Sequence, residues 1–312
     1  VPGWMKESGA MEAPGQLKEE MKAAWAKYFV RFFEDYLSHG ISFWGTTIQN
    51  EPSFGGLPLY AWQKMKWNAT GERTFVADHL GPALSRSEAA KHVKIIALDD
   101  NRYLLPEWAD EVYSDPLSSS FISGVAIHWY FGMLAPVSVL TATHNSYPDK
   151  FILATEACAG SKPPHSGPSL GSWERAEDYA KSIIEDLNNF VVGWIDWNIA
   201  LDTEVVALQS ESFQWRSPII INATADEFLK QPMHYALTHF SRFLRPGSRR
   251  VQSTTVGIDR KKVMLTAFIF EGQRIVTILN TIQTEQEIAI EEEEAGTSIS
   301  LKVPPKSITT VI

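Results

Sequence analysis

The stretch "ISFWGTTIQNEPSFGG" (residues 41–56) decides the fold, because an apolar run ends there abruptly at Asn50-Glu51-Pro52. Val, Ile, Thr and aromatic residues at nearly every position are typical of a strand buried on both faces, as in a parallel sheet. A carboxylate is costly to bury in such surroundings. Glu51 therefore either lies at the solvent-exposed end of a strand by accident or has a function there.

Four further runs are also nearly continuously apolar and rich in Val, Ile and aromatic residues. They are predicted to be strands: 93–100, 122–130, 150–158 and 191–200. Amphipathic segments alternate with these runs and are predicted to be helices: 17–40, 71–84, 105–113, 172–189 and 231–244. Strands that alternate with helices in this way indicate an α/β protein with a parallel sheet.

Polar side chains gather where these runs end: Asn50, Glu51, Asp99, Asp100, His128, Glu156, Asp196, Trp197 and Asn198. In a (β/α)8 TIM barrel, functional groups lie at the carboxyl ends of the strands. We therefore predict a partial (β/α)8 catalytic barrel over residues 1–247. Five strands do not close a barrel, so we expect the three N-terminal strands to be missing from this chain and to precede Val1.

The texture changes after Pro246-Gly247, where short runs of alternating polarity replace the long apolar ones. Residues 248–312 are predicted to form an accessory antiparallel β-sandwich domain, with strands at 251–258, 263–270, 274–281, 286–293, 298–303 and 307–312. The acidic run from Glu291 to Glu294 is expected to be a solvated turn or strand edge.

Composition narrows the function classes. The 312 residues carry a formal net charge of −9, which argues against a nucleic-acid partner. Eleven Trp suit a protein that stacks aromatic rings on a sugar. Cys158 is the only cysteine, so neither a disulfide within the chain nor a Cys-rich metal site can form. Two glycosylation acceptor triplets begin at Asn68 and Asn222 and leave a secretory route open.

Glu51 and Glu156 are the candidate catalytic pair. Each closes an apolar strand, and in a barrel both would reach the same rim. Two carboxyl groups that face each other across a pocket are what glycoside hydrolysis requires. Paired acids at strand ends also serve as metal ligands and as structural ion pairs, and spacing alone leaves these readings open.

Longer motifs carry a family resemblance. At "FWGTTIQNEPSFGG" and "FILATEACAG" the chain resembles the lysosomal glucosylceramidases, the acid β-glucosidases of glycoside hydrolase family 30. The segments "LDDNRYLLPEWA", "GVAIHWYFGMLAP", "VVGWIDWNIAL" and "KQPMHYALTHFSRFLRPGSRRV" match in the same order. The resemblance covers essentially the whole chain.

This resemblance implies a retaining β-glucosidase that hydrolyses glucosylceramide to glucose and ceramide without metal or cofactor. The implied partners are a saposin-type activator protein and an anionic membrane surface, with no nucleic acid. The implied location is the lysosome lumen, reached by the secretory route as a glycoprotein.

The resemblance also implies roles for individual residues. Glu156 matches the nucleophile and Glu51 the acid/base, while Asn50 matches a residue that hydrogen-bonds the sugar 2-hydroxyl. Trp197 resembles the Trp that stacks under the glucose ring, and Trp4 matches a pocket Trp.

His128 and Tyr130 share a strand face because side chains alternate with a period of two. Tyr130 is placed to hydrogen-bond the nucleophile. A lone His at a strand end often has only a structural role. The other polar residues at the neighbouring strand ends favour placing His128 in the site. Asp99, Asp100 and Arg102 are predicted to form a structural ion-pair group beside it.

Further residues near the strand ends leave two readings each. Cys158 is either a small buried hydrophobe or a thiol close to the pocket. Tyr60, Trp62 and Trp67 either form an apolar lip for lipid tails or pack beneath the loop. The segment 202–221 lacks the glycines of the family pattern, which puts the pocket geometry on that side in doubt.

Two other functions remain open on these residues. One is a different family 30 retaining β-glycosidase acting on glucan or xylan, and the other is a non-catalytic truncated paralogue that binds lipid.

Overall fold

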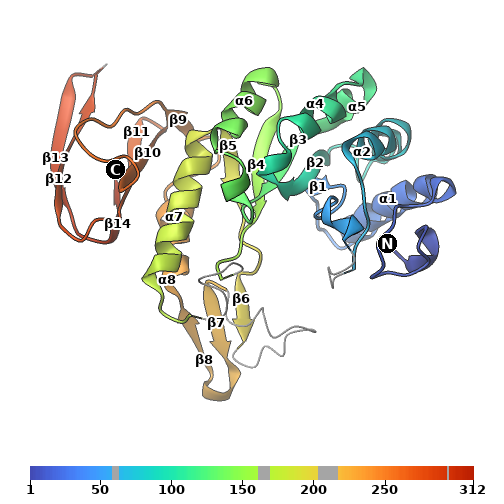
Figure 1. The fold of residues 1–312 in the computed structure, drawn as a ribbon, viewed down its shortest axis with the longest axis horizontal. Helices are drawn as coiled ribbons and strands as arrows, with labels where there is room; N and C mark the ends of the chain where they lie inside the picture. The colour runs from blue at the N-terminus through green and yellow to red at the C-terminus, as the bar shows by residue number, and fades with distance from the viewer. Residues whose placement is uncertain (58–62, 161–168, 203–216, 294) are drawn as a thin grey trace. The chain divides into compact units, whose positions relative to one another are not determined.

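The computed structural model describes residues 1–57, 63–160, 169–202, 217–293 and 295–312 (Figure 1). These residues form two compact units, the first made of residues 1–156 and 189–195 and the second of 157–188 and 196–312. Tyr60, Trp62 and most of the segment 202–221 lie outside the described residues, and so does Glu294. No helix within the described ranges is long and apolar enough to span a bilayer.

A five-stranded sheet organises the first unit. Its strands follow the sequence order and are all parallel: β1 (Gly45–Thr47), β2 (Lys94–Asn101), β3 (Ile122–His128), β4 (Phe151–Glu156) and β5 (Val191–Trp194). The five predicted strands and their parallel sheet are confirmed. The strand of residues 41–49 is shorter than predicted, since only Gly45–Thr47 pair with β2, and that of 191–200 ends at Trp194.

Helices accompany these strands: α1 (Lys22–Ser38), α2 (Ala69–Phe75), α3 (Gly81–Ser85), α4 (Glu107–Tyr113), α5 (Pro116–Phe121) and α6 (Ser138–Ser146). The predicted helix 71–84 is instead three pieces, because a π-helical turn, η4 (Val76–Leu80), separates α2 from α3. The sequence analysis missed α5 and α6. Asp115 caps α5 by accepting hydrogen bonds from the backbone N–H groups of Leu117 and Ser118.

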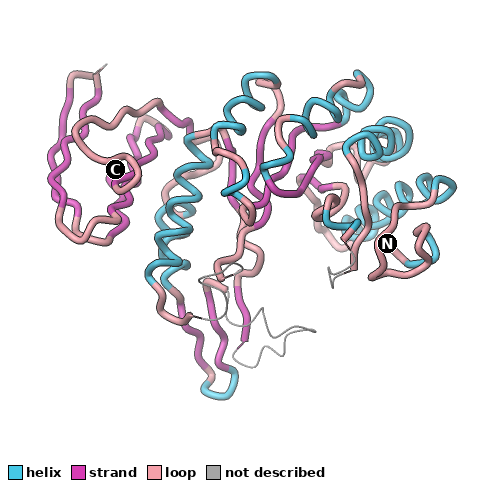
Figure 2. The backbone as a smooth tube through the Cα atoms, in the orientation of Figure 1, coloured by secondary structure: helices cyan, strands magenta, loops and turns pink. Residues whose placement is uncertain are grey.

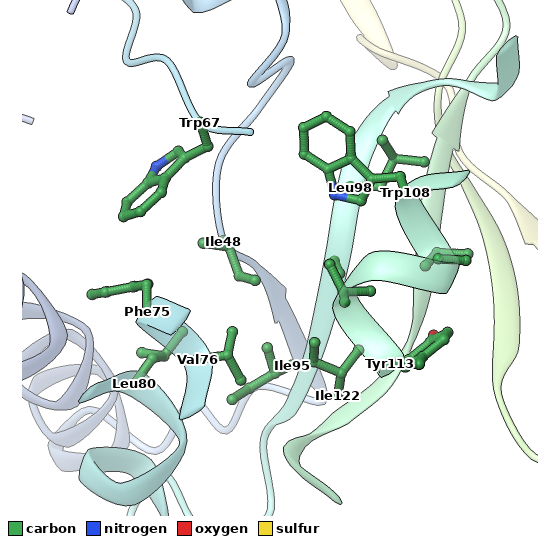
Figure 3. Close-up of a cluster of buried hydrophobic side chains, with 14 of the residues drawn as sticks. Ile48, Trp67, Phe75, Val76, Leu80, Ile95, Leu98, Trp108, Tyr113 and Ile122 are labelled. Atoms are coloured by element: carbon green, nitrogen blue, oxygen red, sulfur yellow. The ribbon is translucent and has the colours of Figure 1, made fainter. Parts of the chain in front are cut away.

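Apolar side chains of β2 and β3 and of α2, η4 and α4 form much of the core of this unit, together with Ile48 directly after β1 (Figure 3). Phe75, Leu80 and Leu98 are completely buried there. Trp67 is also buried, and its ring lies 5.1 Å from that of Phe75. Trp67 therefore packs beneath the loop rather than forming an exposed lip. This packing holds α2 and α4 against the back of β2, which carries part of the site.

The second unit contains α7 (Trp173–Asn188), α8 (Pro232–Ser241) and a small sheet of β6 (Ala200–Asp202), β7 (Ile219–Asn222) and β8 (Glu227–Lys230). The sequence analysis missed the β7–β8 hairpin, whose turn has Asp226 in a left-handed conformation with φ 50°. The turn contains no glycine to mark it in the sequence. Asp226 takes the left-handed position instead, which Asp adopts more readily than most residues.

A β-sandwich completes the second unit. One sheet has the order β14-β11-β10-β9 and the other is the pair β12-β13, with β9 (Arg249–Val251), β10 (Val263–Phe270), β11 (Gln273–Asn280), β12 (Gln286–Glu292), β13 (Thr297–Val303) and β14 (Ser307–Val311). Buried Val263, Ile278 and Val303 pack with Ile288 and Leu301. This confirms the predicted antiparallel sandwich. The strand predicted at 251–258 is wrong, because β9 ends at Val251.

Strands β3 and β4 approach closely at Gly124. A Cβ atom built on Gly124 would lie 2.4 Å from the carbonyl oxygen of Phe151, which is backbone and cannot move aside cheaply. We expect Gly124→Ala to lower the free energy of unfolding by about 1–3 kcal/mol, the range typical of overpacking. Urea denaturation measures this loss, with Ser123→Ala on the same strand as the control. Equal midpoints for the two variants would contradict the prediction.

Candidate active site

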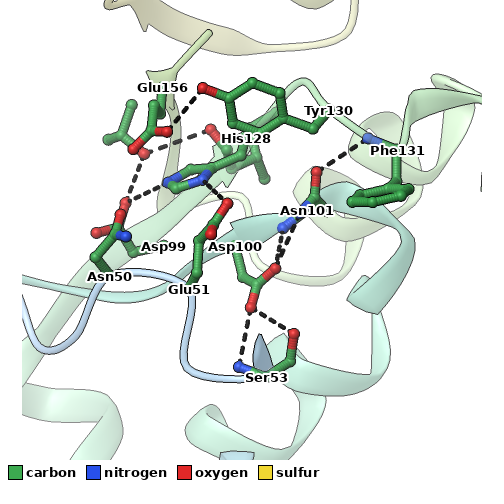
Figure 4. Close-up of polar contacts among 12 residues, drawn as sticks. Asn50, Glu51, Ser53, Asp99, Asp100, Asn101, His128, Tyr130, Phe131 and Glu156 are labelled. Carbon is green, nitrogen blue, oxygen red and sulfur yellow. Dashed lines mark hydrogen bonds and ion pairs between the residues drawn. The ribbon is translucent and has the colours of Figure 1, made fainter. Parts of the chain in front are cut away.

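The carboxyl ends of four neighbouring strands bring five polar side chains together (Figure 4). Glu51 follows β1, Asp99 lies near the end of β2, His128 ends β3, Tyr130 follows it, and Glu156 ends β4. Figure 2 shows the strands of this sheet in magenta among the helices and loops that connect them. Parallel strands meet in this way because their carboxyl ends share one edge of the sheet.

A left-handed backbone conformation orients the side chains of Asp99 and Glu51. Leu98, Asp99 and Glu51 have φ angles of 72°, 54° and 45°, which non-glycine residues rarely adopt. The pairing of β2 with β3 shifts register between Leu98 and Asp100, as in a β-bulge. The backbone N–H of Glu51 donates to the carbonyl oxygen of Asp99 over 2.9 Å. The bulge therefore fixes Asp99 and Glu51 relative to each other.

Asp100 and Asn101 anchor the loops that follow β1 and β3. Asp100 Oδ2 accepts hydrogen bonds from the Ser53 N–H at 3.0 Å and the Ser53 hydroxyl at 2.6 Å. Its Oδ1 accepts from the N–H and side-chain amide of Asn101. Asn101 Oδ1 in turn accepts from the N–H of Phe131 at 3.0 Å. These bonds hold the segments directly after Glu51 and Tyr130 in place.

His128 lies between two carboxylates. Its Nδ1 is 3.2 Å from Glu51 Oε1 and its Nε2 is 3.1 Å from Asp99 Oδ1. Burial lowers the pKa of His128, but the hydrogen bonds to Asp99 and Glu51 and the charges of Asp99 and Glu156 outweigh it and raise that pKa to about 10. With this pKa His128 is an imidazolium, so both ring nitrogens donate, and Glu51 accepts through an oxygen that carries no proton.

Asp99 is buried and accepts several side-chain hydrogen bonds. Besides His128, it accepts from the hydroxyls of Thr47 and Thr155, each at 2.7 Å. Burial opposes ionisation of Asp99, yet these bonds outweigh it and hold the pKa of its carboxyl below the ordinary value. Asp99 is therefore the fixed anionic partner of the His128 cation.

Glu156 is held by Tyr130, whose hydroxyl donates to Oε1 over 2.7 Å. Burial raises the pKa of Glu156, and the charge of His128 together with the Tyr130 hydrogen bond opposes that rise. The negative charges of Glu51 and Asp99 raise the pKa further. The cation and the phenol thus favour the ionised form that a nucleophile requires.

Glu51, His128 and Glu156 each offer one polar atom, and these three atoms lie within 4.8 Å of one another. Three such groups resemble a metal site in composition. His128 does not suit a metal, because an imidazolium that donates from both nitrogens has no lone pair for an ion. The arrangement instead leaves two carboxyl groups facing each other beside one cation.

The remaining predicted site residues are less closely joined to this cluster. Asn50, directly before Glu51, is exposed and is drawn beside the cluster in Figure 4. Trp4 is 62% exposed, and no hydrogen bond or ring contact connects it with the cluster in the described part of the chain. Trp197 belongs to the second unit, where its N–H donates to Ala157 and Asp196. Cys158 is buried, in agreement with the prediction of a small buried hydrophobic residue.

The predicted ion-pair group of Asp99, Asp100 and Arg102 is wrong. Arg102 donates to the carbonyl oxygens of Gly132 and Ala135 and holds the loop after β3. Asp99 contacts His128 while Asp100 contacts Ser53, so neither aspartate pairs with Arg102. Asp99 is a site residue that the sequence analysis missed. Its signal is the pair of aspartates at the end of an otherwise apolar strand.

Comparison with known proteins agrees with this fold. The TIM-barrel domain model of glycosyl hydrolase family 30 matches residues 1–244, and the β-sandwich domain model of the same family matches residues 247–311. The chain belongs to glycosyl hydrolase family 30.

Among its relatives, a putative glucosylceramidase 3 of Caenorhabditis elegans is 44% identical over 320 residues, covering 100% of this chain and 60% of its own length. The lysosomal acid glucosylceramidase of Mus musculus is 38% identical over 301 residues, covering 95% of this chain and 58% of its own. A solved endo-β-1,6-glucanase has a TM-score of 0.82 at 25% identity and covers 99% of this chain and 69% of its own. The chain thus spans about 60% of the length of these two curated relatives.

The raised pKa of His128 ties stability to pH. A base whose pKa rises from 6.5 to about 10 on folding adds stability that is complete below about 6.5 and is lost as pH rises toward 10. We expect the free energy of unfolding to decline over this window, and His128→Gln to remove that part of the decline. Urea denaturation at a series of pH values measures it, with the exposed His39→Gln as control. Parallel curves for the wild type and His128→Gln would contradict the assignment.

Proposed function

We propose that this protein is a retaining β-glucosidase in which Glu156 is the nucleophile and Glu51 the acid/base. The observation that carries the proposal is the approach of the two carboxyl groups to within 4.8 Å at their nearest polar atoms. Retaining glycosidases hold their carboxyl groups about 5–5.5 Å apart, whereas inverting enzymes leave about 6.5–9.5 Å for a water molecule. The separation favours double displacement.

The chemistry follows from the placement of each group. Glu156 attacks the anomeric carbon while Glu51 gives its proton to the glycosidic oxygen, and the aglycone leaves. Glu51 then removes a proton from a water molecule that hydrolyses the glycosyl ester of Glu156. His128 compensates the negative charge that the carboxylates concentrate here, and Tyr130 orients the attacking oxygen of Glu156. Asn50 and Trp197, with Trp4, are proposed to bind the sugar.

Glucosylceramide is the substrate that we propose. The two curated glucosylceramidase relatives support it, and so does the surface beside the site. The loop after β3 carries Phe131, Met133 and Leu134, whose side chains are 38%, 73% and 63% exposed. Leu57, in the loop after β1, is 48% exposed. Apolar side chains at the exits of Glu51 and Tyr130 suit a lipid aglycone better than a polysaccharide.

The same relatives support a lysosomal location, with a saposin-type activator and an anionic membrane surface as proposed partners. Asn68 is exposed at the start of α2 and accepts the N–H of Gly71 through its side-chain oxygen. This bond uses the side-chain oxygen and not the amide nitrogen of the acceptor triplet. We therefore propose Asn68 as the glycan site, because Asn222 uses its amide nitrogen to donate to Glu227.

A second candidate is an endo-β-1,6-glucanase, which the solved enzyme of that activity favours. Release of glucose from glucosylceramide in mixed vesicles, compared with release of oligosaccharides from β-1,6-glucan, separates the two. Glucan hydrolysis without glucosylceramide hydrolysis would overturn the substrate that we propose.

The nucleophile can be identified by covalent labelling. We expect a cyclophellitol-type epoxide to add once to the protein and peptide mapping to place the adduct on Glu156, since only an assembled pocket protonates the epoxide as the carboxylate attacks. Glu156→Gln should remain unlabelled. A folded sample that takes no label would favour the non-catalytic lipid-binding reading.

Tyr130 should set the pH at which Glu156 reacts. Tyr130→Phe removes a donor to the ionised carboxylate, so the pKa of Glu156 rises and the acid limb of the labelling rate moves to higher pH. The rate measured across pH tests this, with the exposed Tyr28→Phe on α1 as control. An unchanged acid limb in Tyr130→Phe would show that this hydrogen bond does not tune the nucleophile.

A further inference from the structure

A carboxyl group lies in the core behind the site and has no part in the reaction described above. Glu72, on α2, is completely buried. The indole N–H of Trp108 donates to its Oε2 over 2.5 Å, and the backbone N–H of Leu98 donates to both oxygens, at 3.2 and 3.3 Å. Glutamate is almost never fully buried unless it is paired, so this placement calls for a reason.

The contact with Leu98 gives that reason. Leu98 is the first of the two left-handed residues of the bulge, where the register between β2 and β3 shifts. A backbone N–H displaced from the sheet ladder must find another acceptor when it is buried. Glu72 supplies this acceptor. The next residue, Asp99, then accepts the N–H of Glu51 through its carbonyl and contacts His128 through its side chain.

We propose that Glu72 is a positioning residue that holds the left-handed bulge at Leu98 and Asp99, and through it the alignment of His128 and Glu51. Glu72 touches no reacting atom and acts through β2. The inference rests on the proposed glycosidase function only for its kinetic readout.

The charges around Glu72 favour its neutral form. The charges of Asp99 and Asp100 on β2 act on it, and among the described residues Tyr113 of α4 also interacts with it. Burial, aided by the two aspartates, raises the pKa of Glu72 to about 7 against its hydrogen bonds. A neutral carboxyl still accepts through its carbonyl oxygen. Glutamine reproduces that acceptor without the charge, whereas methionine keeps the length and removes the acceptor.

The test compares Glu72→Met and Glu72→Gln with Val112→Ala, which opens the core at neighbouring α4 but leaves the hydrogen bonds from the Leu98 amide to Glu72 in place. We expect Glu72→Met to lower kcat on an aryl β-glucoside between about tenfold and about a hundredfold, with KM within about threefold, because misaligned catalytic groups lose rate rather than binding. Glu72→Gln should restore kcat to within about threefold of the wild type. Val112→Ala should keep kcat at the wild-type value.

A second measurement does not depend on turnover. Histidine ¹⁵N NMR follows the pKa of His128, which Asp99 and Glu51 raise to about 10. Glu72→Met should bring this pKa down toward the ordinary value of about 6.5, and Glu72→Gln should leave it high. If the wild type lacks glycosidase activity, the proposed function fails while this measurement still tests the inference. An unchanged His128 pKa in Glu72→Met, or an equal loss of kcat in Val112→Ala, would overturn it.

Discussion

The cation of His128 between Glu51 and Asp99 is the interaction on which the rest of the site depends. Three carboxyl groups, those of Glu51, Asp99 and Glu156, lie close together at the buried edge of the sheet. Without a positive charge among them, burial would favour the protonated forms of Asp99 and Glu156. The imidazolium allows at least one carboxylate to stay ionised in this buried site. The local backbone holds these groups in position through the bond from the Glu51 N–H to the Asp99 carbonyl.

The backbone around this cation is strained and well compensated. Leu98, Asp99 and Glu51 each adopt a left-handed conformation that costs on the order of 1–3 kcal/mol per residue at such sites. Hydrogen bonds from the Glu51 amide to Asp99 and from the Leu98 amide to Glu72 oppose that cost. The tethers from Asp100 and Asn101 to the neighbouring loops do the same. Strain is tolerated here because the surrounding core of β2, α2 and α4 is closely packed.

Two acids, the half-buried Asp196 and the buried Glu72, are better accommodated in their protonated forms at acidic pH. Burial raises the pKa of Asp196 and of Glu72 to about 7, against the hydrogen bonds that each accepts. An acid whose pKa rises on folding contributes stability that is complete below its unfolded pKa and is lost as pH rises through about 7. Asp196 accepts the hydroxyl of buried Tyr179, so this dependence is built into the second unit as well. Both groups therefore fit the lysosomal location proposed for this protein.

The sequence by itself determined the parallel strands and the antiparallel β domain, and it predicted Glu51 and Glu156 as the candidate pair. Continuous apolar runs identify buried strands, and a polar residue at the end of each run identifies the functional edge of the sheet. The roles of Asp99, Arg102 and Glu72 were decided only by the tertiary structure. A bulge reverses the alternation of side chains along β2, so no periodic pattern shows that Asp99 faces His128. Glu72 is 26 residues from Leu98 in the sequence, and only the packing of α2 against β2 makes it the acceptor of that amide.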